Sequence, residues 1–375
     1  MTEPVLDTHA TQLDEAPKVR VERKGALVNF VLNRPKVLNA FDDDMRRILT
    51  EEIPRIARNP DIYVVLLTSA SAKAFCAGGD VRSLAAEAKR DMAKTRQYFA
   101  NEYRLDWLLD CFSKPAVSLI DGICMGSGAG LTSFNTHRVA AENYKWAMPE
   151  TAIGLFPDVG VAHVLARMPW PTGLYLGLTG RSVNRADAHW LGLATHCISS
   201  AHFGRITSLL SEAEPIDPLL DNLHETQGAG PLENEADMIR DFFSGASIGH
   251  IVDALQRANG AGKGAAKMWA DAALADLMKR SPLSLKITDR HIREARKLDL
   301  RQTLIQDYRL AWRCLEAPDF AEGVRAALID KDNRPKWSPP SLDLVTAEMV
   351  QAYFAPLGSD DLQLLSREEM QAARF

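Results

Sequence analysis

The chain has 375 residues, of which 46% are hydrophobic and 25% are charged, and its formal net charge is -5. This is the balance of an ordinary globular protein, long enough for one large domain with an appended region or for two domains. The slight negative charge excludes a general electrostatic attraction to nucleic acid or to an anionic membrane surface.

The cysteines and the first residues indicate a reducing, cytoplasmic compartment. The five cysteines form no CxxC pair, so free thiols are expected rather than a zinc site or a redox dithiol. Residues 1–17 are polar and acidic, without an apolar signal core or an arginine-rich presequence, and are expected to form a flexible tail. No apolar run reaches membrane-spanning length. We therefore predict a cytoplasmic protein without a metal site.

The first 200 residues alternate between predicted strands and helices. Apolar residues alternate over 19–33 on both sides of Lys24-Gly25, which predicts a β-hairpin. Asp42 is expected to begin a helix that Pro54 bends or shortens. Repeated strand–turn–helix units predict a sheet covered by helices. Further strands are predicted over 62–68, 116–120, 138–141, 145–148 and 194–199, a loop over 69–79, and helices from near Asp80, over 95–112 and from Leu131.

The composition changes after about residue 200. Leucine, alanine and charged residues then dominate, which predicts a helical region with a flexible interruption near 227–231. Ser281-Pro282 is a favourable helix start, with serine as the cap and proline in the first helical position. The predicted division is a tail over 1–17, an α/β core over 18–200, and a helical region over 201–375 that packs on the core and completes the active site.

Two familiar signatures fail in the glycine-rich segment 126–130. The sixth position of a GxGxxG pattern is occupied by Leu131, so the segment is no dinucleotide fingerprint. Met125 occupies the first glycine position of a GxSxG pattern, so Ser127 is not predicted to be a nucleophile.

Three short segments could still carry chemistry. Residues 73–80 place two glycines before an acidic helix start, and residues 121–130 place small residues between a buried strand and a helix. Each allows close approach of a ligand to a free backbone N–H, although each could also be only a tight turn or close packing. Residues 148–160 place Glu150 and Asp158 in an apolar stretch, where burial would raise their pKa values. Capping of short helices is the plain alternative for both carboxylates.

In combination, these segments resemble a known superfamily. KAFCAGGD, GICMGSGAG and WAMPETAIGLFPDVG, in this order, are similar to motifs of the crotonase (enoyl-CoA hydratase/isomerase) superfamily. AMPETAIGLFPDVG, SPLSLKIT, FAEGVRAALIDKD and RPKW resemble more narrowly its 3-hydroxyisobutyryl-CoA hydrolase branch. The resemblance extends from about Val19 to Phe354. It implies an α/β fold, a crotonase-like spiral of strand–strand–helix units with a C-terminal helical region.

The resemblance assigns roles to backbone groups. In the family, two backbone N–H groups bind the thioester oxygen in an oxyanion hole, and the matching residues here are Gly79 and Ser127. The second position is usually glycine, so Ser127 is a departure that adds a Cβ next to the acyl group. Substrate-binding positions implied by the family are Ala74, Cys76, Ala77 and Gly126, with the adenine near the first three of them.

The carboxyl groups separate a hydrolase from a hydratase in this family. Family hydratases have one glutamate two residues beyond the glycine triplet, where this chain has Gly130, and a second in the motif that matches Glu150. The hydrolase branch has an aspartate eight residues later, here Asp158. It also has a glutamate on the preceding helix, for which Glu102 is the positional match. A mid-helix glutamate is otherwise typical of a solvated face.

The resemblance therefore implies an enzyme that hydrolyses a short 3-hydroxyacyl-CoA thioester, with 3-hydroxyisobutyryl-CoA of valine catabolism as the leading substrate. Glu150 would activate water or attack the carbonyl, and Asp158 would hold the 3-hydroxyl or share a proton with Glu150. A hydratase or isomerase for a short acyl-CoA, and a non-catalytic acyl-CoA-binding subunit, are the alternatives.

The expected partner is an acyl-CoA, with neither nucleic acid nor membrane. CoA enters as part of the substrate, so no separate cofactor is expected. The superfamily often forms trimers, whereas the hydrolase branch varies, so the resemblance leaves a homo-oligomer open. The sequence does not identify the Lys or Arg side chains that would bind the CoA phosphates.

Overall fold

The computed structural model describes residues 16–261 and 264–375. It has the predicted α/β architecture, with strands in the first 200 residues and helices through most of the remainder. Most of the predicted tail lies outside the described residues. Among the residues that are described, no helix is both long and apolar enough to cross a membrane.

The strands belong to two sheets. Their bounds are β1 Val19–Lys24, β2 Leu27–Leu32, β3 Val64–Ser69, β4 Ala74–Cys76, β5 Ala116–Ile120, β6 Ile123–Met125, β7 His137–Ala140, β8 Lys145–Ala147 and β9 His196–Cys197. The larger sheet has the order β1-β2-β3-β5-β7-β9, antiparallel in the first hairpin and parallel elsewhere. The smaller sheet has the order β4-β6-β8 and is parallel throughout.

Helices surround both sheets. The α-helices are α1 Asp43–Arg58, α2 Val81–Ala88, α3 Met92–Cys111, α4 Ser127–Ser133, α5 Val161–Leu165, α6 Thr172–Thr179, α7 Arg185–Trp190, α8 Phe203–Ser211, α9 Ile216–Asp221, α10 Pro231–Asn234, α11 Ala236–Phe243, α12 Ile248–Ala261, α13 Ala265–Leu277, α14 Pro282–Ala295, α15 Leu300–Glu316, α16 Pro318–Val324, α17 Ala347–Phe354 and α18 Arg367–Ala372. The short turns are η1 Pro35–Val37, η2 Glu150–Ile153, η3 Ser200–His202, the π-turn η4 Arg325–Ile329, η5 Leu342–Leu344 and η6 Gly358–Asp360.

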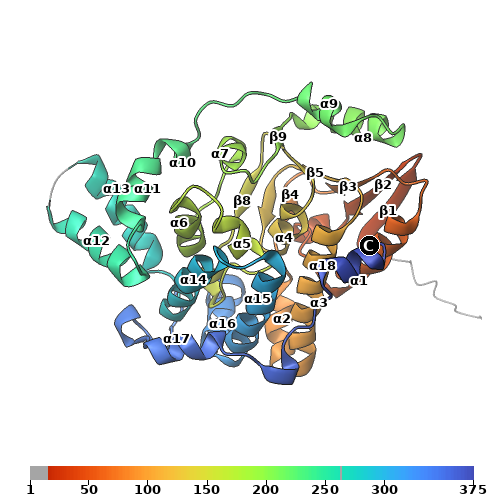
Figure 1. The fold of residues 1–375 in the computed structure, drawn as a ribbon. Helices are drawn as coiled ribbons and strands as arrows, with labels where there is room; N and C mark the ends of the chain where they lie inside the picture. The colour runs from red at the N-terminus through yellow and green to blue at the C-terminus, as the bar shows by residue number, and fades with distance from the viewer. Residues whose placement is uncertain (1–15, 262–263) are drawn as a thin grey trace, which may run out of the picture.

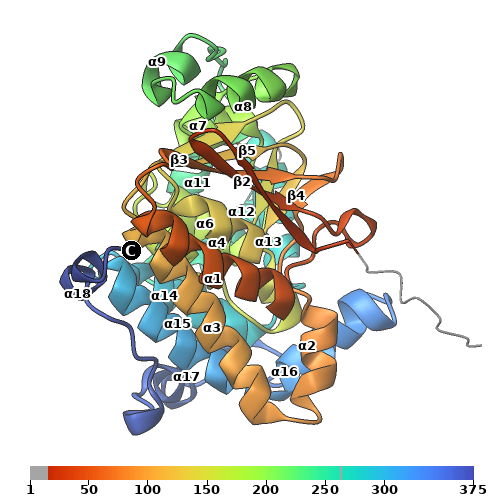
Figure 2. The ribbon, with the colours of Figure 1, turned by 90° about the vertical axis from the view of Figure 1, so that its right-hand side faces the viewer.

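The large sheet has an apolar core on each face. In β3, Val65 and Leu67 face a core shared with α1, α3 and the C-terminal helices, whereas Val64 and Leu66 face a smaller core that includes Ile206 of α8. This alternation is the two-residue period of a strand that is buried on both faces. In both views α8 and α9 lie beyond the sheet from α1 and α3 (Figures 1 and 2).

Several predicted boundaries are confirmed. The hairpin pairs β1 with β2, and Asp42 caps α1 by accepting a hydrogen bond from Met45 N at 3.1 Å. Pro54 lies inside α1, which nevertheless continues to Arg58. The Ser281 side chain caps α14, as predicted, by accepting from the N–H of the third residue beyond it. Residues 224–230 contain no helix or strand, as expected for the interruption.

Two predictions near the glycine-rich segments are wrong. The segment 69–79 is not only a loop, because it contains β4, and the helix expected from Leu131 begins at Ser127. The reason is tertiary packing, since glycine has a low helix propensity. A Cβ at Gly128 would lie only 2.5 Å from Cys76 O, so this helix packs directly on the backbone of β4. Propensity alone therefore does not show where it starts.

The C-terminal helices pack on the earlier elements. α15 contacts α3, and α14 contacts α5 and α6. In both views α18 lies beside α1 and α3 (Figures 1 and 2), and Trp107 Nε1 of α3 donates to Leu365 O at 2.9 Å. The division into a core over 18–200 and a helical region over 201–375 stays a prediction.

The small sheet positions the three motif segments. The chain leaves β4 into residues 77–80, leaves β6 into residues 126–130, and leaves β8 into residues 148–150. Because the carboxyl ends of parallel strands meet at one edge of a sheet, these three loops are brought side by side.

Candidate active site

The three loops line one cavity of about 700 Å³. Of the residues singled out from the sequence, those that line it are Ala77, Gly79, Glu102, Gly126, Ser127, Glu150 and Asp158. Ala74 and Cys76 are not among the lining residues, because both are completely buried in β4. The cavity therefore unites the predicted backbone donors with the predicted carboxyl groups.

Two residues with unpaired backbone N–H groups, Gly79 and Ser127, line the cavity from neighbouring loops. A Cβ built on Gly79 would be 3.2 Å from Ser127 Oγ, so the loops after β4 and β6 nearly touch. In the described part of the chain, neither the Gly79 N–H nor the Ser127 N–H donates a hydrogen bond. Two such unpaired donors can hold an oxygen that gains negative charge during a reaction.

Gly126 allows this close approach. Its φ of +50° lies in the left-handed region. A Cβ here would lie 3.2 Å from Glu150 Oε1 and 3.3 Å from Gly78 Cα. A side chain at position 126 would therefore separate the carboxyl group from the two donors.

Glu150 is a buried carboxyl group that forms no ion pair with any residue the structure describes. It begins η2, which two residues separate from the end of β8, and is 7% exposed. Its Oε2 is buried without a hydrogen-bond partner among the described residues. Burial raises the pKa of Glu150 well above its usual value, and the nearby Asp158 raises it further. The group can therefore act as a base or a nucleophile once it has lost its proton.

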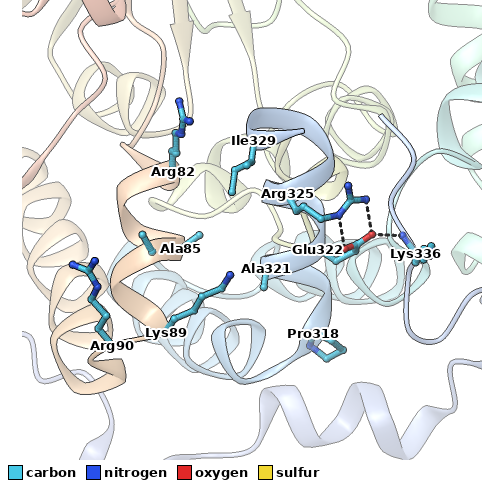
Figure 3. Close-up of a pocket in the computed structure, with 11 residues that line it drawn as sticks. Arg82, Ala85, Lys89, Arg90, Pro318, Ala321, Glu322, Arg325, Ile329 and Lys336 are labelled. Atoms are coloured by element: carbon cyan, nitrogen blue, oxygen red, sulfur yellow. Dashed lines mark hydrogen bonds and ion pairs between the residues drawn. The ribbon is translucent and has the colours of Figure 1, made fainter. Parts of the chain in front are cut away.

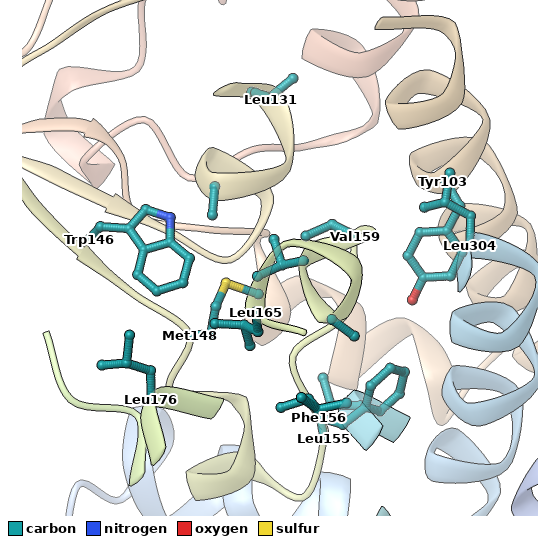
Figure 4. Close-up of a cluster of buried hydrophobic side chains, with 14 of the residues drawn as sticks. Tyr103, Leu131, Trp146, Met148, Leu155, Phe156, Val159, Leu165, Leu176 and Leu304 are labelled. Atoms are coloured by element: carbon teal, nitrogen blue, oxygen red, sulfur yellow. The ribbon is translucent and has the colours of Figure 1, made fainter. Parts of the chain in front are cut away.

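Asp158 is held by a tyrosine from α3. Tyr103 Oη donates to Asp158 Oδ2 at 2.8 Å, and both side chains are buried. Leu155, Phe156 and Val159 place apolar side chains around this segment (Figure 4). Burial, and secondly the nearby Asp307, raise the pKa of Asp158 to about 8, while the tyrosine hydrogen bond opposes the rise.

Glu102 also faces the cavity. It is 3% exposed, so it does not lie on a solvated helix face. Arg46 of α1 donates to Glu102 Oε2 through Nε at 2.9 Å and also through Nη2. Glu102 thus differs from Glu150 and Asp158, because it has a buried cation as its partner.

Sequence reasoning missed several residues around the site. Asp106 lies four residues beyond Glu102 and three beyond Tyr103, spacings that could have placed it on a face of α3 shared with each of them. From the C-terminal region, Leu328 and Lys331 line the cavity. Both lie within FAEGVRAALIDKD, so the resemblance of this segment to the hydrolase branch is the signal that could have indicated them.

A further C-terminal contact holds the loop after Asp158. Gly160 N donates to Asp307 Oδ2 at 2.7 Å, and Asp307 Oδ1 is bonded to His291 Nε2. Asp307 and His291 are both completely buried. The helices α14 and α15 therefore fix the segment that carries Asp158.

The space beside Gly130 is already filled. A Cβ at this position would lie 2.8 Å from Asp106 Oδ1 and 2.8 Å from Val159 Cβ. A larger side chain would require these buried neighbours to move. The position that holds a glutamate in family hydratases therefore has no room for one here.

A second hollow of about 850 Å³ lies between α2 and the α16–η4 segment. Arg82 of α2 and Lys89, the residue after α2, line it opposite Ala321 and Ile329 (Figure 3). Arg82 lines both this hollow and the cavity of the three loops. Neither Gly79 nor Ser127 lines the second hollow.

Gly130→Ala is expected to destabilise the fold. The added methyl group overpacks a buried position and should lower the free energy of unfolding by about 1–3 kcal/mol. Gly204→Ala is the matched control, because a Cβ at this position in α8 meets nothing within 4 Å. Chemical denaturation of both variants tests the expectation, and equal stabilities would contradict it.

Asp158→Asn is expected to make stability less dependent on pH. The folded-state pKa lies above the ordinary value of 3.8, so the folded protein holds a proton that the unfolded chain releases. This contribution to stability is complete below about pH 4 and is lost as the pH rises through about 8. The variant should therefore melt above the parent near pH 8 and close to it near pH 4. Asp61→Asn, at an exposed position, is the control; parallel curves for Asp158→Asn and the parent would refute the expectation.

The chain is similar over most of its length to proteins of known sequence and structure. A family model described as enoyl-CoA hydratase/isomerase matches residues 27–354. Proteins named "3-hydroxyisobutyryl-CoA hydrolase, mitochondrial" from Gallus gallus and Homo sapiens are each 38% identical. The first alignment covers 94% of this chain and 92% of the relative, and the second covers 93% and 92%.

Solved structures agree with this similarity. A carnitinyl-CoA dehydratase from Mycobacterium thermoresistibile is 34% identical with a TM-score of 0.86, and covers 93% of this chain and 99% of its own. An enoyl-CoA hydratase from Rhodobacter sphaeroides is 32% identical with a TM-score of 0.85, and covers 92% and 100%. The fold, the motif loops and these similarities agree, and the chain belongs to the enoyl-CoA hydratase/isomerase, or crotonase, family.

Proposed function

We propose that this protein hydrolyses a short 3-hydroxyacyl-CoA thioester, with 3-hydroxyisobutyryl-CoA as the substrate in valine catabolism. The observation that carries the proposal is that Glu150 and the two free N–H donors line one cavity. At the same site, Gly130 leaves no room for the additional glutamate of family hydratases. The names of relatives that are 38% identical support the same substrate. Free acid and CoA are the products.

The proposed reaction begins at the two backbone donors. The N–H groups of Gly79 and Ser127 bind the thioester oxygen and stabilise the charge that develops on it. Glu150 then removes a proton from the attacking water, or attacks the carbonyl carbon itself to form an anhydride that water hydrolyses. In either route the C–S bond breaks and the CoA thiolate leaves. It departs without a strong acid because its pKa is near that of cysteine, about 8.5.

Asp158 is proposed to share a proton with Glu150. Each group lies in the same cavity, and the charge of Asp158 contributes to the raised pKa of Glu150. Tyr103 fixes one oxygen of Asp158 and leaves the other for a substrate hydroxyl or a proton. Both parts of the sequence prediction, a hydroxyl contact and proton sharing, are compatible with this geometry.

The CoA part is proposed to enter between the loops after β4 and β6. Lys36, Arg82 and Lys331 line the cavity and supply positive charge for the phosphates. Of the three residues expected near the adenine, only Ala77 lines the cavity, and the contact is proposed there, because Ala74 and Cys76 are completely buried.

A hydratase or dehydratase is the second candidate, because the two solved structures named above carry those titles. Gly130 argues against it. Two carboxylates flank the water in family hydratases, and the first of them would collide here with Asp106 and Val159. A non-catalytic binding subunit is the third candidate. Burial of carboxyl groups without a cationic partner costs free energy, and a protein that only binds acyl-CoA would have no need to bury Glu150 and Asp158 in this way.

Three predictions from the sequence stay predictions. The cytoplasmic location is one of them, and the relatives from chicken and human are named mitochondrial proteins. The others are that no metal or redox cofactor is required and that the oligomeric state is open, with a homo-oligomer as one option.

Thiol release is expected from 3-hydroxyisobutyryl-CoA and more slowly from 3-hydroxypropionyl-CoA, with little or no hydration of crotonyl-CoA. The reason is that hydrolysis requires the two N–H donors and Glu150, whereas hydration in the family also uses the glutamate whose position is occupied here by Gly130. A thiol reagent and the ultraviolet absorbance of the enoyl group measure the two reactions. Rapid hydration of crotonyl-CoA without thiol release would show that the protein is a hydratase.

Glu150→Gln is expected to reduce thiol release by about 10²–10⁴-fold, which is the usual contribution of a positioned general base. The amide keeps the shape of the side chain, so the affinity for free CoA should change little. Glu142→Gln is the control, because Glu142 bonds Ser200 outside the cavity. Activity of the Glu150 variant within a few-fold of the parent would remove this residue from the reaction.

A further inference from the structure

Arg46 is a buried cation that the proposed reaction does not use. It lies in the first turn of α1 and is 2% exposed. Its Nη1 donates to Asp43 Oδ1, while its Nε and Nη2 donate to Glu102 Oε2. A buried guanidinium requires such partners, because desolvation of an unpaired charge is expensive.

The ion pair occupies only one of the two carboxyl oxygens of Glu102. Both bonds from Arg46 reach Oε2, and within the described residues Oε1 accepts no hydrogen bond. Glu102 lines the cavity together with Glu150 and Asp158. Neither of these other carboxyl groups forms an ion pair in the described parts of the chain. Glu102 is therefore the carboxyl group of the cavity that has a buried cationic partner on one oxygen and keeps its other oxygen for a ligand.

Arg46 also supports the donor loop. Its guanidinium carbon lies 4.0 Å from the centre of the Tyr98 ring. Tyr98 Oη donates to Phe41 O at 3.2 Å and would be 3.0 Å from a Cβ on Gly79. Phe41 is paired with Gly79 in a short parallel bridge. One side chain thus connects the acyl end of the cavity with the loop that presents the first N–H.

We infer that Arg46 is a positioning residue for substrate selection, which holds Glu102 as a charged acceptor for a hydroxyl group on the acyl chain. This inference rests on the proposed hydrolase function. A hydroxylated acyl group donates its O–H to Glu102 Oε1, whereas an analogue without the hydroxyl leaves this buried oxygen unpaired and is disfavoured. Asp158 then keeps the proton that it shares with Glu150.

The inference predicts a selective loss in Arg46→Lys. Lysine keeps the charge but lacks the planar fork that binds one carboxylate through two nitrogens and stacks on an aromatic ring. The ratio of kcat/KM for 3-hydroxyisobutyryl-CoA to that for isobutyryl-CoA should fall by about tenfold or more, through the hydroxylated ester. Arg47→Met is the matched control, because the neighbouring Arg47 is exposed and pairs with Glu51.

A double variant separates positioning from folding. Arg46→Met with Glu102→Gln removes both buried charges, so no unpaired ion remains, and its ratio should be as low as that of Glu102→Gln alone. Thermal stability is measured on every variant. An unchanged ratio in Arg46→Lys, or a normal ratio in the double variant, would overturn the inference even if stability falls. If the parent released no thiol from either ester, the proposed hydrolase function would be refuted instead. The ratio of the two esters' binding constants, measured by calorimetry, would then test the role of Arg46.

Discussion

The candidate site depends on the free-energy cost of removing carboxyl groups from water. Glu102, Asp106, Glu150 and Asp158 lie buried around one apolar cavity, and Asp307 lies beneath it. An ionised carboxylate in such surroundings needs a cation or several hydrogen bonds, and otherwise it keeps its proton. Arg46 supplies the cation for one of them. Burial raises the pKa values of Asp106, Glu150 and Asp158 above those of ordinary carboxyl groups. Such perturbed carboxyl groups are typical of acid–base and nucleophilic sites.

The small parallel sheet brings these buried carboxyl groups together with the backbone donors. β4, β6 and β8 each end at a loop of the cavity, so residues 77–80, 126–130 and 148–150 meet without long connections. The loops after β4 and β6 contribute backbone donors, and the loop after β8 contributes Glu150. The helices α3, α14 and α15 then hold the segment beyond it through Tyr103 and Asp307. A rigid scaffold of strands and helices therefore fixes groups that would repel one another in a flexible chain.

The sequence predicted most of the strands, the main helices and the site residues Gly79, Glu102, Ser127, Glu150 and Asp158, because alternating apolar patterns, glycine-rich turns and long ordered motifs are local signals. It did not predict the short strands β4 and β6 or the start of α4 at Ser127. The start of α4 depends on close packing against the backbone of β4. Arg46 was missed for a related reason. It is a charged residue in the first turn of a helix, where exposure is usual. Its partner Glu102 is 56 positions away in the sequence, and only the folded chain shows that the two side chains are in contact.

The pH dependence of kcat/KM for 3-hydroxyisobutyryl-CoA tests most directly the claim that buried, poorly paired carboxyl groups carry the reaction. Glu150 must lose its proton to act, and its pKa lies well above the ordinary 4.5. The rate constant should therefore rise with pH through a midpoint well above the ordinary pKa of a glutamate, and this rise should be absent from the residual activity of Glu150→Gln. A profile that is flat from pH 5 to 8, or one that shows the same rise in the variant, would contradict the account.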